Sequence, residues 1–255
     1  MSADIQAAVS SFHKRSPRSL NVVWDPPPND IGVEVDWSKW YLTDEDDMGE
    51  GGEQNLIIRI FISILTELAH ERGWSDVFIG ADQFFAWVEE EPLVRVSPDV
   101  YVLDFQPARP LPASWQTWRS GHRPPRLAVE IVSEDWRKDY EQGPLKYAQL
   151  GVRELVVFDP EAACARAGAP ERVPIQVFRR EVDGGFLRVH RGGEPARSEE
   201  LDAWLVVMRD GEAATLGVSR DASGLDLVPT LEQARLTAEA RIAELERKLA
   251  VVERK

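Results

Sequence analysis

The chain has 255 residues, which is enough for one large domain with an appendage or for two small domains. Its hydrophobic fraction of 43% and charged fraction of 29% are those of a globular protein and exclude an intrinsically disordered one. The net charge of −14 excludes a surface that is basic overall, which is the usual means of binding nucleic acid.

The charge is unevenly distributed along the chain. Ten acidic residues and a single base, Lys39, lie between Asp25 and Glu53. The segment from Arg109 to Arg126 has the opposite character, because it carries four arginines, one histidine and no acid. Either this segment is solvated surface or it forms a local basic strip on an acidic protein. Its Trp115 and Trp118 either stack on bases or pack the segment onto the core.

We expect a cytoplasmic protein. The sequence has no run of about 20 apolar residues, so it predicts no membrane span. Residues 1–20 carry basic side chains without the apolar core of a secretory signal. The one cysteine, Cys164, excludes an internal disulfide and fits a reducing compartment.

The first predicted helix follows a long irregular segment. Residues 1–42 have little periodicity, and we interpret them as an N-terminal extension with one strand at 31–35. An acidic, glycine-rich loop is expected at 43–52. A helix is then predicted for 54–71, ending at Gly73, because apolar residues recur at helical spacing. These residues are Leu56, Ile57, Ile60, Phe61, Ile64, Leu65 and Leu68.

Strands are predicted after this helix. The segments 76–79 and 83–88 flank Gly80-Ala81-Asp82, which predicts a hairpin. The next strand is expected to begin at Asp99, because Pro98 before it cannot donate a hydrogen bond to a sheet. A long loop rich in proline and tryptophan follows this strand, and loops of that length inside a domain are usually functional or mobile.

The most informative strand is 127–132. It is almost wholly apolar, as is typical of a central strand covered on both faces, but Glu130 interrupts it. A polar segment at 133–142, a helix that ends at Leu150 and a strand at 155–158 come next. This strand–helix–strand unit predicts a right-handed crossover and a parallel strand pair.

The last part of the chain changes character. A hairpin at 175–180 and 186–190 and a strand at 203–208 complete the domain expected at 43–215. A capping box then predicts a helix at 229–255. Its apolar residues fall at coiled-coil spacing, although Arg235 interrupts the first heptad. They are Leu231, Ala238, Ile242, Leu245, Leu249 and Val252. Self-association through this helix is one interpretation, and an amphipathic helix lying on the domain is the other.

Asp99 and Glu130 are the residues with the clearest chemical potential. A carboxylate inside an apolar strand is costly to bury unless it is paired, protonated or bound to a metal. If the two strands are neighbours, the two carboxylates converge at one sheet edge, where they would suit Mg²⁺. The alternatives are a solvent-facing Glu130 and an Asp99 that caps a turn. No histidine spacing suggests a metal site, and Cys164 lacks the surroundings of a nucleophile.

Several motifs occur in a characteristic order. They are Ser97-Pro98-Asp99-Val100, Val129-Glu130-Ile131-Val132-Ser133, Asp139, Tyr147-Ala148-Gln149-Leu150-Gly151-Val152-Arg153-Glu154 and Phe158-Asp159-Pro160. In this order and spacing the chain resembles, over residues 43–208, the bacterial Uma-two (Uma2) family of putative restriction endonucleases within the PD-(D/E)XK nuclease superfamily. The resemblance implies an α/β fold with a restriction-endonuclease-like mixed sheet flanked by helices. A coiled-coil tail frequently accompanies this domain in the family.

The resemblance also assigns roles to individual residues. Asp99 matches the metal-binding aspartate of the Pro-Asp motif, and Glu130 matches the second acidic ligand. The backbone carbonyl of Ile131 corresponds to the third protein ligand of a bound Mg²⁺ or Mn²⁺. The family's histidine at the start of the first helix is replaced by Gln54, and Glu53 beside it is either an extra carboxylate or a surface residue.

The lysine that orients the attacking water departs from the pattern. Its usual place, two residues after the glutamate, is Val132. In this family the lysine commonly moves to the next helix, between residues that match Asp139 and Tyr147, and that place is Gly143. Pro144 follows and is expected to weaken or restart the helix. Lys146 and Lys138 are the nearby substitutes.

Two functions therefore remain open. The first is a Mg²⁺-dependent DNA endonuclease in which Asp99 and Glu130 hold the metal and Lys146 or Lys138 supports the water. Loss of a general base typically slows a reaction by about 10²–10⁴-fold without removing the contribution of the metal. The second is a catalytically degenerate nuclease fold that acts as an interaction module and forms homo-oligomers through the C-terminal helix.

Overall fold

The computed structural model describes residues 14–15, 22–23, 35–36, 52–133 and 135–252. Most of the expected N-terminal extension, the expected loop up to residue 51 and residues 31–34 of the strand expected at 31–35 lie outside the described residues. The elements, in chain order, are β1 (Lys14–Arg15), β2 (Val22–Val23), β3 (Val35–Asp36), α2 (Gly52–Arg72), β4 (Phe78–Gly80), β5 (Phe84–Ala86), β6 (Arg95–Val96), β7 (Val100–Leu103), β8 (Ser114–Gln116), β9 (Leu127–Ile131), the π-helical turn η2 (Lys138–Gln142), α3 (Gly143–Leu150), β10 (Glu154–Phe158), α4 (Pro160–Ala163), β11 (Ile175–Arg180), β12 (Phe186–Gly192), β13 (Ala196–Ser198), β14 (Ala203–Asp210), β15 (Ala213–Ser219) and α5 (Leu231–Val252).

A seven-stranded mixed sheet organises the domain, in the order β2-β12-β11-β10-β9-β7-β4. β9 and β10 run parallel, as the strand–helix–strand pattern predicts, and α3 lies in the crossover between them. β10, β11 and β12 pair antiparallel, which confirms the second predicted hairpin. The predicted α/β class, a mixed sheet flanked by helices with a C-terminal helix, is confirmed.

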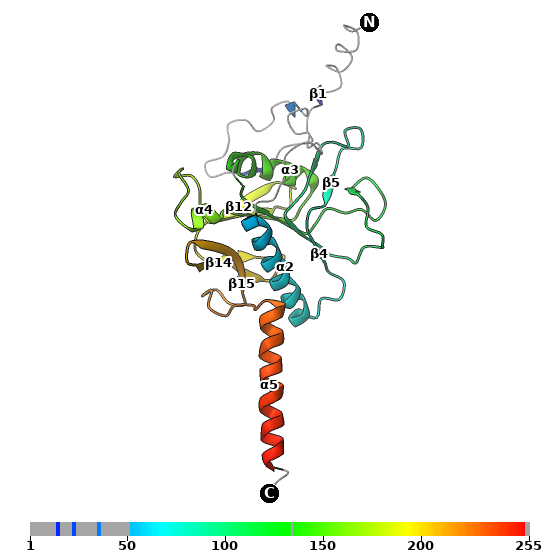
Figure 1. Cartoon of the computed structure of the whole chain (residues 1–255). Helices are drawn as coiled ribbons and strands as arrows, with labels where there is room; N and C mark the ends of the chain where they lie inside the picture. Colours follow the sequence, from blue (N-terminus) through cyan, green and yellow to red (C-terminus); the bar gives the residue numbers. More distant parts are fainter. Residues whose placement is uncertain (1–13, 16–21, 24–34, 37–51, 134, 253–255) are drawn as a thin grey trace.

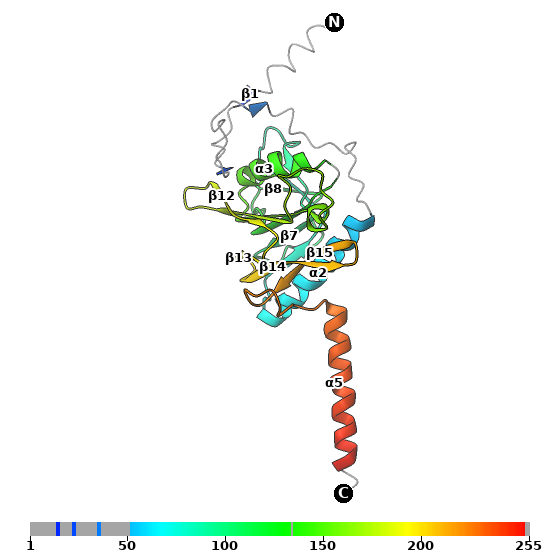
Figure 2. The same cartoon turned by 90° about the vertical axis from the view of Figure 1, so that its left-hand side faces the viewer.

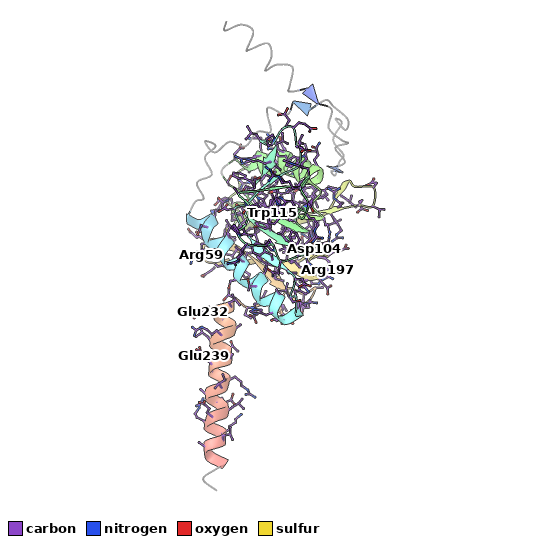
Figure 3. The ribbon with its side chains drawn as sticks, turned by 90° about the vertical axis from the view of Figure 1, so that its right-hand side faces the viewer. Arg59, Asp104, Trp115, Arg197, Glu232 and Glu239 are labelled. Carbon is purple, nitrogen blue, oxygen red and sulfur yellow. The ribbon has the colours of Figure 1, made fainter. Side chains whose placement is uncertain are left out.

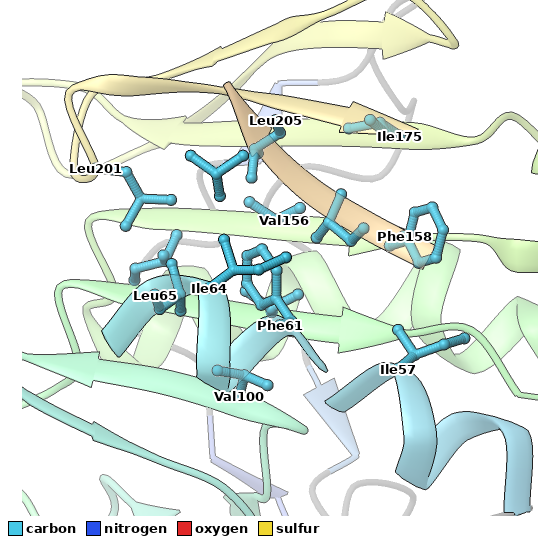
Figure 4. Close-up of a cluster of buried hydrophobic side chains, with 14 of the residues drawn as sticks. Ile57, Phe61, Ile64, Leu65, Val100, Val156, Phe158, Ile175, Leu201 and Leu205 are labelled. Carbon is cyan, nitrogen blue, oxygen red and sulfur yellow. The ribbon is translucent and has the colours of Figure 1, made fainter. Parts of the chain in front are cut away.

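One face of the sheet packs against α2 and the three-stranded sheet β13-β14-β15 (Figures 1 and 2). Ile57, Phe61 and Ile64 point from α2 onto the sheet, where they meet Val100 and Val156 (Figure 4). All five side chains are inaccessible to solvent. The apolar residues that predicted α2 by their helical spacing therefore form one continuous stripe, and this stripe is buried in the core.

The opposite face packs against α3 and against the small sheet β6-β5-β8. Side chains alternate across a strand, so Ala128 and Val132 of the β9 segment belong to this second core, whereas Val129 and Ile131 face α2. Because β9 is covered on both faces, its near-continuous apolar sequence is explained. The same alternation directs Glu130 toward the side that carries α3.

The hairpin predicted across 80–82 is wrong. β4 pairs with β7 in the large sheet, whereas β5 pairs with β6 and β8 in a separate sheet. The two short strands diverge at this turn, so neighbouring strands in sequence are not neighbours in space. The long loop after β7 also supplies β8, which is parallel to β5.

The helix ends agree with the sequence. α2 stops at Arg72, and Gly73 takes the left-handed φ of 65° that ends it. The predicted capping box of α5 forms, because Gln233 N donates to Thr230 Oγ1 at 3.2 Å and Thr230 N donates to Gln233 Oε1 at 2.9 Å. Among the residues that the structure describes, no helix is long and apolar enough to cross a membrane.

Substitution of Gly80 tests how tightly β4 packs against β7. Gly80 lies opposite Tyr101, and a Cβ at Gly80 would come within 2.5 Å of the Tyr101 ring. Because Tyr101 is buried, we expect Gly80→Ala to lower the free energy of unfolding by about 1–3 kcal/mol, measured by urea denaturation. Gly168→Ala, which meets no atom within 4 Å, is the control. Equal stability of the two variants would contradict this packing.

Candidate active site

Asp99 and Glu130 lie at one edge of the large sheet, where β9 ends and β7 begins. Val100 of β7 pairs with Val129 of β9, so one further step along the antiparallel register places Asp99 opposite Glu130. The Glu130 side chain falls on the side of the sheet that carries α3, whereas the Asp99 carboxylate lies at the end of the β7–β9 ladder, within reach of α2. Neighbouring strands thus bring the two predicted carboxylates together, as the sequence hypothesis requires.

Asp99 is held by the backbone of β9. Ile131 lies beyond the last β7–β9 pair, and its N–H donates to Asp99 Oδ2 at 2.6 Å. The carboxylate therefore replaces the carbonyl that a longer β7 would have supplied to this buried donor. Asp99 is 8% exposed, and its other oxygen, Oδ1, accepts a hydrogen bond from Gln54 Nε2 at 3.0 Å.

Gln54 reaches the sheet edge from the first turn of α2. Its Nε2 also lies 3.4 Å from the carbonyl oxygen of Ile131. Gln54, Asp99 and Ile131 therefore form a closed set of three hydrogen bonds. The sequence marked Gln54 only as a replacement for a histidine and gave it no role in this arrangement.

Glu130 accepts a short hydrogen bond from the Tyr147 hydroxyl of α3. Burial raises the pKa of Glu130 well above its ordinary value, and the negative charges of Asp99 and Asp139 raise it further. Burial and the charge of Glu130 also raise the pKa of Tyr147, so this phenol remains a donor. The site therefore disfavours the ionised form of Glu130, chiefly because this carboxyl group is buried.

Asp139 is a third carboxyl group of this site. It lies in the π-helical turn η2, is 8% exposed and accepts a hydrogen bond from Ser133 N at 3.3 Å. Burial raises the pKa of Asp139 to about 6. The sequence placed Asp139 and Tyr147 in a frame around a missing lysine, but assigned neither of them a contact with Glu130.

The two candidate lysines occupy different surroundings. Lys138 is exposed at the start of η2, and its positive charge lowers the pKa of both Glu130 and Asp139. Lys146 is buried in α3, next to Tyr147, with 8% of its surface exposed. Gly143 is the first residue of α3 and Pro144 lies in its first turn. The helix does not restart there, because Gln142 and Gly143 keep helical backbone angles and the Gly143 N–H bonds to the Lys138 carbonyl, so that the π-helical turn η2 leads directly into α3.

Asp159, at the end of β10, is a buried carboxylate that forms an ion pair with Arg172 and a hydrogen bond with η2. Asp159 follows β10 and accepts two hydrogen bonds from Arg172, at 2.7 and 2.8 Å. It also accepts one from the Tyr140 hydroxyl at 2.8 Å and caps α4 through Ala162 N at 2.9 Å. The Asp159-Pro160 motif of the sequence thus positions η2, because Tyr140 lies next to Asp139 in that turn.

The basic segment after β7 is largely engaged in packing. Trp115 is 2% exposed and stacks on Phe85 (its position is labelled in Figure 3). Arg123 lies over the Phe105 ring and forms an ion pair with Asp104 at 3.2 Å. Packing of the loop onto the core is therefore the correct interpretation for Trp115.

The donor set of the site fits a hard divalent cation. Asp99 Oδ1, Glu130 and the Ile131 carbonyl all offer oxygen atoms at one sheet edge, and hard divalent cations prefer oxygen ligands. Burial, together with the charges of Asp99 and Asp139, raises the pKa of Glu130, and a cation beside it would favour its ionised form. Within the described ranges, no group of three or more His, Cys, Asp or Glu side chains could hold a metal ion. A cation here would therefore depend on the backbone carbonyl and on water.

Residues 45–207 match the family model Uma2, described as "Putative restriction endonuclease". No curated protein matches the chain. Among solved structures, the chain is similar to a putative nuclease belonging to DUF820 from Anabaena variabilis ATCC 29413, with 11% sequence identity and a TM-score of 0.40. That match covers 67% of this chain and 79% of that chain, and at such a TM-score it carries no argument.

The raised pKa of Asp139 predicts a pH dependence of stability. The folded protein holds this proton more tightly than the unfolded chain, so the free energy of unfolding should fall as the pH rises from about 4 to about 6. Asp139→Asn should remove on the order of 2–3 kcal/mol of that fall, measured by urea denaturation between pH 4 and pH 7.5.

Asp210→Asn, at an exposed carboxyl group, is the control and should leave the pH profile of the wild type in place. Identical profiles for the wild type and Asp139→Asn would contradict the environment described for Asp139.

Proposed function

Since the chain belongs to the Uma2 family of putative restriction endonucleases, we propose that it is a metal-dependent endonuclease that hydrolyses phosphodiester bonds in DNA. The observation that carries the proposal is the register that sets Asp99 against Glu130, next to the Ile131 carbonyl, at one sheet edge. Two acidic groups and a carbonyl in that arrangement suit a divalent cation that acts on a phosphate, because all three offer oxygen ligands.

We propose Mg²⁺ or Mn²⁺ as the cofactor, held by Asp99, Glu130 and the Ile131 carbonyl. When bound, such a cation neutralises charge on the phosphate and lowers the pKa of water. The protein contributes orientation. The Tyr147 hydroxyl fixes one oxygen of Glu130, and the Ile131 N–H fixes one oxygen of Asp99, so each carboxylate presents its remaining oxygen in a defined direction.

The water-orienting group is proposed to be a lysine from outside the usual position. Lys138 is supported by its exposure and by the effect of its charge on Glu130 and Asp139. Lys146 remains the alternative, since it precedes Tyr147 in α3. Gly143 has no side chain to offer, so a member of the family with this residue should be a slow enzyme rather than a fast one.

DNA is proposed as the substrate, and the cytoplasm as the compartment. The acidic net charge means that attraction of DNA must come from local groups, and we propose that the exposed Arg119 of the basic segment, just after β8, is one of them. The single cysteine of the chain fits a reducing compartment.

Plasmid cleavage tests the proposed activity. The wild type should nick or cut supercoiled DNA with Mg²⁺ or Mn²⁺, and Asp99→Asn and Glu130→Gln should each abolish this. Lys138→Ala should slow cleavage by about 10²-fold or more if Lys138 orients the water, and Lys146→Ala is the parallel test of the alternative. Glu181→Gln, at an exposed acid on the turn after β11, should cut at the wild-type rate. No cleavage by the wild type, or equal cleavage by Asp99→Asn, would rule out the proposal.

A second function, an interaction module built on a degenerate nuclease fold, is favoured by α5. This helix extends away from the domain (Figures 1 and 2), and its Glu232 and Glu239 project from it in Figure 3. Ile242, Leu245 and Leu249 are 55%, 44% and 60% exposed on it. We propose that two or more chains associate through this stripe as a coiled coil, a role compatible with either function.

Ile242→Glu should dissociate such an oligomer, because it places a charge in the apolar stripe of α5. Ala240→Glu, which adds the same charge on the opposite face of the helix, should leave the mass in solution unchanged, as measured by light scattering over a range of concentrations. A wild type that is monomeric throughout, or an Ile242→Glu variant with the wild-type mass, would eliminate association through α5.

A further inference from the structure

The side-chain amide of Gln54 contacts the same two oxygen atoms that the proposed cation would use. Nε2 lies 3.0 Å from Asp99 Oδ1 and 3.4 Å from the Ile131 carbonyl oxygen. Both oxygens are acceptors, so only the amide nitrogen, and not the amide oxygen, can face them. The Gln54 amide therefore directs two N–H groups at the position between these oxygens.

A cation at this position and the Gln54 amide exclude each other in this rotamer. A divalent cation approaches its oxygen ligands to about 2.0–2.6 Å, which is the distance at which an amide donor places its hydrogens. The partial positive charge on these hydrogens would then lie against the cation. Before a cation can contact Asp99 and Ile131, Gln54 must give up both hydrogen bonds.

The packing of α2 on the sheet holds Gln54 close to its two acceptors. Gln54 is in the first turn of α2, and α2 is fixed to the sheet by the buried side chains of Ile57, Ile58 and Phe61 within the next two turns. Asp99 is held in turn by the Ile131 N–H. The amide thus faces a prearranged pair of acceptors, and a hydrogen bond from it to a carboxylate is stronger than one between neutral groups.

We propose that Gln54 is a built-in competitor for the divalent cation, an amide that substitutes for the metal at Asp99 and Ile131 and sets how tightly the metal binds. This inference rests on the proposed metal site and adds a residue that regulates it. Removing the amide should tighten metal binding, because the cation then no longer competes with the two Gln54 hydrogen bonds. A hydrogen bond to a charged group corresponds to roughly a tenfold change in affinity, so we expect about that gain.

The experiment measures binding of Mn²⁺ alone by isothermal titration calorimetry at pH 7.5, with the full-length chain. Gln54→Ala and Gln54→Met should each bind Mn²⁺ roughly tenfold more tightly than the wild type. Gln54→Met keeps the length of the side chain, so it separates the loss of the donor from the space that alanine opens. Leu56→Ala, at an exposed side chain of the same helix, is the control and should bind as the wild type does.

Thermal unfolding provides an independent measurement. Without metal, Gln54→Ala should unfold at a lower temperature than the wild type, because Asp99 loses a partner. Saturating Mn²⁺ should then raise the unfolding temperature of Gln54→Ala by more than that of the wild type, since tighter binding gives greater stabilisation. This comparison shows that each variant folds before its affinity is interpreted.

The contrary outcomes have separate meanings. Weaker binding by both Gln54 variants would overturn the inference, because Gln54 would then be a ligand. Unchanged affinity would also overturn it and leave Gln54 with a structural role only, while the proposed metal site stands. If the wild type and all Gln54 variants fail to bind Mn²⁺, the metal site itself is wrong, and the inference falls with it.

Discussion

The candidate site depends on one buried backbone donor, the N–H of Ile131. β9 extends past the start of β7, so this donor has no carbonyl to pair with in the ladder, and the Asp99 carboxylate takes that place at 2.6 Å. An unpaired backbone donor in such a position would be costly. The hydrogen bond that satisfies it also sets the orientation of Asp99, and it leaves Oδ1 and the Ile131 carbonyl directed toward the same point. This one hydrogen bond therefore completes the pairing of the sheet and also orients a residue of the candidate site.

The fold makes the ionised form of Glu130 unfavourable. Apolar layers on both faces of β9 raise the pKa of Glu130, and the nearby acids add to the effect. The buried pair of Asp159 and Arg172 shows the alternative, since there a carboxylate is fully matched by a guanidinium. The two carboxyl groups lie near the ends of the neighbouring strands β9 and β10, but only Asp159 faces a bidentate guanidinium, whereas Glu130 accepts its hydrogen bond from a phenol.

The two acids of the site could be predicted from the sequence, but the groups that contact them could not. Asp99 and Glu130 could be singled out because each interrupts or opens an apolar strand. Whether these strands are neighbours stayed open in the sequence and is answered by the pairing of β7 with β9. Gln54 and Tyr147 come from helices whose first turns and faces are set by tertiary packing, so spacing could not place them. The wrong hairpin at residues 80–82 has a similar origin, because the partners of β4 and β5 come from strands later in the chain.

The π-helical turn η2 determines which residues of the following helix face Glu130. In an uninterrupted α-helix, Asp139 and Tyr147 are eight residues apart and point about 80° away from each other. A π turn accommodates one additional residue, which reduces the effective separation to about seven α-helical positions and the offset to roughly 20°. This explains how both side chains influence the same carboxylate. It also means that η2 acts as a one-residue insertion, so a chain with one residue fewer here would achieve the same alignment with ordinary helical geometry.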